Sequence, residues 1–140
     1  MNPRSLSILV VDDDALSLRL VSRQLDKLGD HRVDAVTGGD EALARLTSSR
    51  YDLVLLDLIM PRVNGIDVLR WIARRPQLDS TRVIVISAED SQSSRQAAWA
   101  HGASDVLLKP FSTRTLQRRI SRLSSAPRLR PLAQSTILLH

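Results

Sequence analysis

The sequence predicts a doubly wound α/β fold, a (βα)5 three-layer sandwich with a parallel five-stranded sheet between two layers of helices. Three observations predict it. Five short apolar runs alternate with longer stretches in which apolar residues recur every three or four positions. Each run is almost uninterrupted, which is typical of parallel strands that are buried on both faces. The length of 140 residues suits one compact domain and a short tail.

The first predicted strand is the apolar run at residues 8–11. The helix after it meets a stop signal at Gly29 and carries on one face the apolar residues Leu18, Val21, Leu25 and Leu28. A weaker run at residues 33–36 predicts the second strand. Two glycines then lead into a second helix, in which acidic residues at the start precede Ala42, Leu43 and Leu46.

The central strand is predicted at residues 53–56, because four consecutive apolar residues must be buried on both faces of a sheet. A third helix follows a loop that holds Pro61 and Gly65. Pro76 ends this helix, whose apolar residues are Ile66, Leu69, Ile72 and Ala73. Residues 83–86 then form the fourth predicted strand.

A serine-rich opening at residues 91–94 begins a fourth helix, which ends at His101 and Gly102. Residues 106–108 form the fifth predicted strand. Ser112 can cap a fifth helix, whose apolar face consists of Leu116, Ile120 and Leu123. The segment after this helix is broken by prolines and is predicted to be a tail.

Polar residues follow four of the predicted strands, at the point where each apolar run stops. They are Asp12 and Asp13, Asp57, Ser87 and Lys109. Because the carboxyl ends of parallel strands meet at one edge of an open α/β sheet, we expect these residues to converge on one site. Asp14, next to the first pair, is expected only to cap the helix that follows.

Three neighbouring carboxylates repel one another unless a cation compensates them. Oxygen-only ligands without histidine or cysteine favour a hard ion, and few carboxylates plus waters suit Mg²⁺ better than Ca²⁺. Lys109 adds a fixed positive charge, and it is one of only two lysines in a chain that otherwise uses arginine. A metal, a lysine and a hydroxyl around one carboxylate indicate a site for a phosphoryl group, with Asp57 as the nucleophile.

Four segments in order and spacing resemble the receiver domains of two-component response regulators, over roughly residues 6–124: ILVVDDD, LVLLDLIMPRVNG, VIVISA and GASDVLLKPF. The resemblance implies a flavodoxin-like sheet with strand order 2-1-3-4-5. It also implies that residues 1–124 form the receiver domain and that residues 125–140 are a tail or the stub of a linker.

The resemblance further implies roles for the acidic residues. Asp57 would receive a phosphoryl group from the phosphohistidine of a histidine kinase or from a small phosphodonor. Mg²⁺, or Mn²⁺ in its place, would be held by Asp13, Asp57 and the backbone carbonyl of Ile59, with Asp12 acting mainly through bound water.

The same resemblance assigns the other side of the site. Ser87 and Lys109 would grip the phosphoryl oxygens, and the small Ala88 would let its backbone N–H approach them. The peptide bond between Lys109 and Pro110 is expected to be cis.

Two positions depart from the commonest pattern of these domains. Val106 stands where relatives usually have tyrosine or phenylalanine as a switch residue, so we expect the signal to leave through Ser87 and the loop after it. Ile59 stands where many relatives have a polar residue. An apolar side chain there would obstruct a hydrolytic water, and we expect a longer-lived phosphorylated state than asparagine would allow.

The positive charge is concentrated near the carboxyl terminus. The formal net charge is +5, and residues 111–140 contain no acid but six arginines: Arg114, Arg118, Arg119, Arg122, Arg128 and Arg130. A solvated face, an acidic partner and a dimer contact all remain open for this helix. By analogy with relatives, a homodimer through the fourth helix, fifth strand and fifth helix could pair Asp105 with Arg118 or Arg119 across a two-fold axis.

The expected partners are a sensor histidine kinase or phosphotransfer protein and a downstream protein or output domain. We expect no direct nucleic-acid binding, since no helix-turn-helix follows and aromatic residues make up only 3% of the chain. The absence of cysteine suits a reducing compartment, and no segment is long enough to cross a bilayer. A cytoplasmic location is therefore expected.

Two other functions compete with this interpretation. An aspartate-nucleophile phosphatase would need a second aspartate where Ile59 stands and a cap insertion for which the chain has no room. A receiver with a degenerate site could serve as a constitutive docking module, although all the chemical residues are present. We therefore expect a signalling domain rather than an enzyme, one that catalyses only its own phosphoryl transfer and dephosphorylation.

Overall fold

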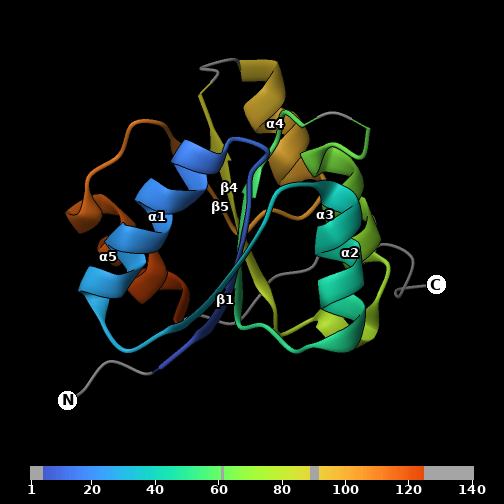
Figure 1. The fold of residues 1–140 in the computed structure, drawn as a ribbon. Coiled ribbons are helices and arrows are strands. Elements are labelled where there is room, and N and C mark those ends of the chain that lie inside the picture. Colours follow the sequence, from blue (N-terminus) through green and yellow to red (C-terminus); the bar gives the residue numbers. More distant parts are fainter. Residues whose placement is uncertain (1–4, 61, 89–91, 125–140) are drawn as a thin grey trace.

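The computed structural model describes residues 5–60, 62–88 and 92–124, and it contains a five-stranded parallel sheet (Figure 1). The strand order is β2-β1-β3-β4-β5, so the predicted fold class and order 2-1-3-4-5 are both confirmed. The strands are β1 (Ser7–Val11), β2 (Arg32–Val36), β3 (Leu53–Asp57), β4 (Arg82–Ser87) and β5 (Asp105–Leu108).

Helices cover both faces of this sheet. Helices α1 and α5 lie on one face and helices α2, α3 and α4 on the other (Figure 1). Their bounds are α1 (Ala15–Leu28), α2 (Gly39–Ser48), α3 (Gly65–Ala73), α4 (Gln92–Ala100) and α5 (Thr113–Ser124). Among the described residues, no helix has both the length and the apolar character needed to span a membrane.

The central strands have two buried faces because two separate cores pack against the sheet. In β1, Ile8 and Val10 face the core beneath α1 and α5. Leu9 and Val11 alternate with them and face the core beneath α2, α3 and α4. Burial of each such side chain stabilises the fold by about 1.5–3 kcal/mol. This two-sided burial is the reason that the strands are uninterrupted apolar runs.

Polar side chains start several helices as the sequence predicts. The carboxylate of Asp14 accepts the backbone N–H of Leu16 at 3.0 Å and caps α1. The hydroxyl of Ser112 accepts the backbone N–H of Thr115 at 3.0 Å before α5. Helix α3 has a capping box that the sequence analysis did not identify, in which Asn64 and Asp67 bond reciprocally.

The strand boundaries differ from the predicted ones by one residue at several ends. Polar residues extend β3, β4 and β5, since the hydrogen bonds of a strand join backbone atoms whatever the side chain; these residues are Asp57, Arg82, Ser87 and Asp105. A short 3₁₀ helix, η1 (Pro76–Leu78), follows α3 and was not predicted. The predicted start at Ser91 and the tail at 125–140 lie outside the described residues.

Candidate functional site

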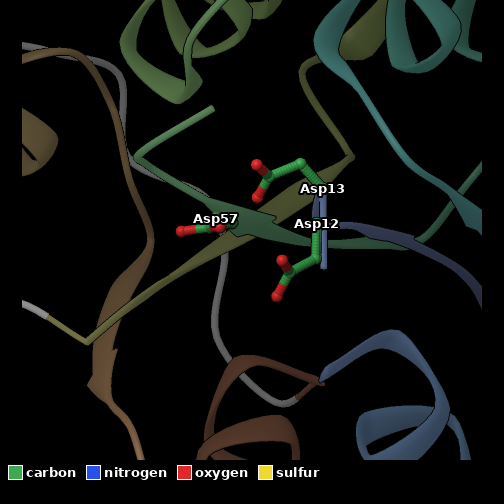
Figure 2. A group of neighbouring side chains, drawn as sticks. All are labelled: Asp12, Asp13 and Asp57. Atoms are coloured by element: carbon green, nitrogen blue, oxygen red, sulfur yellow. The ribbon is translucent and has the colours of Figure 1, made fainter. Parts of the chain in front are cut away.

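The carboxyl ends of β1 and β3 bring three aspartates together. These strands are neighbours in the sheet, and their register pairs Val11 with Leu56. Asp12 follows β1 and Asp57 ends β3, so the two lie side by side with Asp13 next to them (Figure 2). One carboxylate oxygen from each of the three lies within 4.8 Å of the others.

The segment after β1 holds Asp12 in place. Its backbone N–H donates to the carbonyl of Val36 at 3.2 Å, which continues the pairing with β2 by one residue. Its Oδ1 accepts the backbone N–H of Asp14 at 2.9 Å. Asp12 is buried, whereas the following Asp13 is exposed. The two acidic neighbours therefore differ, because one is fixed in the sheet edge and the other faces solvent.

Lys109 brings positive charge to the same edge from the end of β5. Its backbone N–H donates to the carbonyl of Ser87 at 2.8 Å, which joins the segment after β5 to the end of β4. Its ammonium donates to Oδ2 of Asp12 at 2.7 Å. Among the described contacts, none joins this ammonium to Asp57. The bond between Lys109 and Pro110 is cis, as predicted.

The chain after β3 is packed tightly beside Asp57. The backbone N–H of Ile59 donates to Oδ1 of Asp57 at 3.3 Å. A β-carbon on Gly65 would lie 2.5 Å from the carbonyl oxygen of Asp57 and 2.6 Å from Cα of Leu58. Only glycine lets α3 begin this close to the end of β3. Ile59 itself is 59% exposed.

The surroundings shift the pKa values of Asp57 and Asp12 in opposite directions. Burial, followed by the negative charge of Asp12, raises the pKa of Asp57 to about 6, although Lys109 and the Ile59 N–H oppose the shift. Burial also disfavours the charged form of Asp12. Hydrogen bonds from Lys109, the Asp14 N–H and Ser17 outweigh that cost and lower the pKa of Asp12.

Ser87 ends β4, the strand next to β3, and Ala88 comes directly after it. The register of β3 and β4 pairs Asp57 with Ile86, so Ser87 comes one residue beyond it, at 2% exposure. Ala88 comes next and is exposed. Val106 lies in β5, half-buried against the core beneath α2, α3 and α4. The structure thus brings Ser87 and Ala88 to the edge that holds the aspartates and places Val106 below it.

A family model for the response regulator receiver domain matches residues 8–121. The chain belongs to the response regulator receiver domain family. It is 37% identical over 116 residues to the transcriptional regulatory protein ResD of Bacillus subtilis, covering 83% of this chain and 47% of ResD. It is 36% identical over 130 residues to the phosphate regulon transcriptional regulatory protein PhoB of Rhizobium meliloti, covering 93% of this chain and 56% of PhoB.

Solved receiver structures are similar over nearly the whole fold. The chemotaxis protein CheY4 of Vibrio cholerae superposes with a TM-score of 0.79 at 29% identity, covering 86% of this chain and 99% of CheY4. The BeF3-activated receiver domain of DrrB gives 0.77 at 29% identity, covering 88% of this chain and all of that domain. The receiver spans about half the length of the curated relatives it matches.

The names of those relatives bear on the expectation about nucleic acid. Two of the relatives are named as transcriptional regulators. The comparisons therefore count weakly against the expectation that nucleic acid is not a partner. That expectation was drawn only from the residues of this chain, which covers 47% of ResD and 56% of PhoB.

The receiver forms an ion pair between Arg119 and Asp105 within one chain. The sequence left open a pair of Asp105 with Arg118 or Arg119 across a two-fold axis, whereas Nη1 of Arg119 donates to both carboxylate oxygens of Asp105 in the same chain, at 2.8 and 2.9 Å. Asp105 is 5% exposed, and α5 packs close enough to β5 for the arginine to reach it. The pair joins two elements of one receiver, so it needs no second copy.

The donor atoms at the edge of the receiver fit a hard divalent ion. Asp12, Asp13 and Asp57 offer only oxygen, and no histidine belongs to the cluster. The acidic cluster could therefore bind a metal ion.

Sequence reasoning missed two contacts of this edge. It placed Lys109 at the site but did not identify Asp12 as the partner of its ammonium. It also placed Gly65 in a loop without identifying its contact with the backbone of Asp57. A glycine directly after asparagine at a helix start was the available signal for a close backbone approach.

Proposed function

We propose that this receiver accepts a phosphoryl group on Asp57 and passes the signal to a partner or an output domain. The convergence of three carboxylates, Lys109 and Ser87 at one edge of the sheet carries the proposal. Phosphoryl transfer depends mainly on positioning and charge neutralisation, and this edge offers a nucleophile with cations and donors around it.

The reaction is an in-line displacement at phosphorus. An ionised oxygen of Asp57 forms a new bond to phosphorus, the bond from phosphorus to the donor breaks, and the donor leaves with the electron pair of that bond. With a phosphohistidine donor the leaving group is the imidazole of the kinase, and with acetyl phosphate it is acetate. The carboxylate of Asp57 becomes an acyl phosphate.

Mg²⁺, or Mn²⁺ in its place, would be held by Asp13, Asp57 and the backbone carbonyl of Ile59, with Asp12 acting through water. When bound, the ion supplies positive charge that offsets the negative oxygens of the phosphoryl group. The N–H of Ile59 donates to one oxygen of Asp57, which restrains the orientation of that carboxylate.

Ser87, Ala88 and Lys109 would bind the oxygens of the transferred group. Ser87 would donate its hydroxyl, Ala88 its backbone N–H, and Lys109 its ammonium. The ammonium donates to Asp12 at 2.7 Å and would exchange that partner for the phosphoryl oxygens. We propose that this exchange accompanies phosphorylation.

The partners follow from the same proposal. A sensor histidine kinase or phosphotransfer protein would supply the phosphoryl group. An output domain, as in the longer relatives, or a separate downstream protein would read the result. The receiver would act as a signalling domain in the cytoplasm and would catalyse only transfer to and from its own Asp57.

Intact-mass spectrometry after incubation with acetyl phosphate and Mg²⁺ tests the proposal. We expect one phosphoryl adduct on the native chain, none on Asp57→Asn, and none when EDTA removes the metal. Asp26→Asn is the matched control, since Asp26 is exposed on α1 away from the site and should leave the adduct unchanged. A native chain that stays unmodified under these conditions refutes the proposal and favours a docking module.

A further inference from the structure

A cavity lies between helix α1 and the segment that joins β5 to α5, residues 109–112. It has a volume of about 440 Å³, which is within the range of roughly 300–1,000 Å³ typical of pockets for small ligands. Its lining residues belong to α1, to the joining segment and to Thr113, the first residue of α5. Helices α1 and α5 lie side by side on one face of the sheet (Figure 1).

Positive charge gathers at this cavity. Arg23 and Lys27 line it from α1, four residues apart and therefore on one side of the helix, and Lys109 lines it from the joining segment. None of the described residues that line it is acidic. Lys109 is bonded to Asp12, whereas the described part of the chain shows no ion pair of Arg23 or Lys27. Two exposed cations are therefore available to an anion.

Apolar side chains line the same cavity. Val21 is 5% exposed and belongs to the core beneath α1 and α5. Phe111 is partly buried and packs against that core. Leu20, on α1, is 53% exposed. The cavity therefore combines cations with an apolar surface, part of which belongs to the core and part of which is open to solvent.

Hydrogen bonds hold the two sides of the cavity together. Nε2 of Gln24, on α1, donates to the carbonyl of Phe111 in the joining segment at 3.0 Å. The backbone N–H of Lys109 donates to the carbonyl of Ser87, which ties the start of the segment to β4. Because both sides are fixed by the fold, a ligand would bind here without the cost of ordering them.

The charge and the apolar surface limit the class of ligand. Inorganic phosphate would use the cations and leave the apolar side chains without a partner. A neutral apolar molecule would leave Arg23 and Lys27 without a counter-charge. An organic phosphate monoester carries about −1.5 to −2 charges near pH 7, which matches two cations, and it also has an apolar part.

We propose that this cavity binds a small organic phosphate monoester, with the phosphate on Arg23 and Lys27 and the apolar group against Val21 and Phe111. The inference goes beyond the proposed function, because no step of phosphoryl transfer to Asp57 uses these four residues.

Nuclear magnetic resonance of the ¹⁵N-labelled full chain tests the proposal, with 1-naphthyl phosphate as the probe and without Mg²⁺. We expect saturable shifts at the backbone amides of residues 20–27 and 111–113, and none along α2 on the other face of the sheet. Inorganic phosphate and 1-naphthol, which each lack one half of the probe, should bind at least about tenfold more weakly.

The double variant Arg23→Gln, Lys27→Gln should raise the dissociation constant of 1-naphthyl phosphate about tenfold or more. Leu20→Asn should raise it several-fold, since it removes apolar surface from the cavity. The matched control is Arg19→Gln, Arg118→Gln, which also removes two exposed cations, neither of which lines the cavity. It should change the dissociation constant less than about twofold, and circular dichroism should show every variant folded.

Asp57→Asn separates this site from the phosphoryl site and should bind the probe as the native chain does. Shifts confined to the ends of β1, β3 and β4 and lost in Asp57→Asn would place the probe at the aspartates and overturn the proposal. Equal losses in the two double variants would overturn it in favour of a general charge effect. The absence of any saturable shift at millimolar concentrations of the probe would refute it.

Discussion

Two ion pairs in this receiver look alike and differ in what surrounds them. Lys109 donates to Asp12 at 2.7 Å, and Arg119 donates to Asp105 at 2.8 Å. Both aspartates are buried, at 4% and 5% exposure. The first pair lies beside further carboxylates at the edge of the sheet, whereas the second pair joins β5 to α5.

The neighbours decide which pair can rearrange. Asp12 lies beside two further carboxylates, Asp13 and Asp57, which compete with it for the ammonium of Lys109. An incoming metal or phosphoryl group therefore changes the best partner for that ammonium. Around Asp105, the two oxygens already accept Arg119 and the Val106 N–H. A cation in a group of several acids is suited to exchange, while a cation on one fully bonded acid holds two elements together.

Removal of the first pair should have the largest effect, and it should act on the chemistry. Lys109→Met removes the ammonium that would bind the phosphoryl oxygens. We expect labelling by acetyl phosphate to slow about a hundredfold, as when one donor to a developing charge is lost. The rate is followed by intact mass over time. Lys27→Met, which changes the other lysine, should label at the native rate; equal slowing in both variants would contradict the assignment.

Removal of the second pair should act on stability. Arg119→Met leaves Asp105 buried with only the Val106 N–H as a donor, and we expect the free energy of unfolding to fall by about 2 kcal/mol. Urea denaturation measures this change, with Arg118→Met as a control that should alter stability by less than about 0.5 kcal/mol. The labelling rate should stay close to native. If Arg119→Met lost labelling and kept its stability, the pair of Arg119 and Asp105 would belong to the chemistry and not to the stability of the fold.

The raised pKa of Asp57 makes the stability of the receiver dependent on pH. Between the ordinary value near 3.8 and the folded value of about 6, the native state binds more protons than the unfolded state, so stability falls as pH rises through this window. Asp57→Asn removes that cost. We expect the variant to be more stable by about 1–2 kcal/mol at pH 7.5, in the absence of Mg²⁺, and to lose this advantage near pH 4.

Urea unfolding at several pH values measures the difference, and Asp26→Asn serves as the exposed control. A gain that is the same at pH 4 and pH 7.5 would show that the charge of Asp57 is not its cause. Labelling of the native chain should also slow at acid pH, because protonation of Asp57 removes the nucleophile.

The smallest expected effect concerns the lifetime of the phosphorylated state. The backbone N–H of Ile59 donates to the carboxylate of Asp57, and Ile59 is 59% exposed. Ile59→Asn should speed loss of the phosphoryl group several-fold, since a polar side chain admits and orients water where isoleucine excludes it. Leu16→Asn, an equally exposed apolar position on α1, is the control. Equal decay of the native chain and Ile59→Asn would refute the idea.

Much of the fold could be predicted because burial leaves a direct trace in the sequence. The run at residues 53–56 is apolar at every position, and the structure buries all four side chains between the two cores. The end of each run also placed Asp12, Asp57, Ser87 and Lys109 at one edge, because parallel strands end together. The 3₁₀ helix at Pro76–Leu78 was not predicted, since its three residues are too few to show a period.

The sequence by itself therefore determined the order of the elements, the sheet and the residues that gather at its carboxyl edge. Only the tertiary structure decided which charges pair: Lys109 with Asp12, and Arg119 with Asp105 inside one chain. The physical reason is the separation along the sequence of the residues involved. Burial depends on each residue's own side chain and leaves a local pattern, whereas an ion pair depends on where two distant backbones bring their side chains.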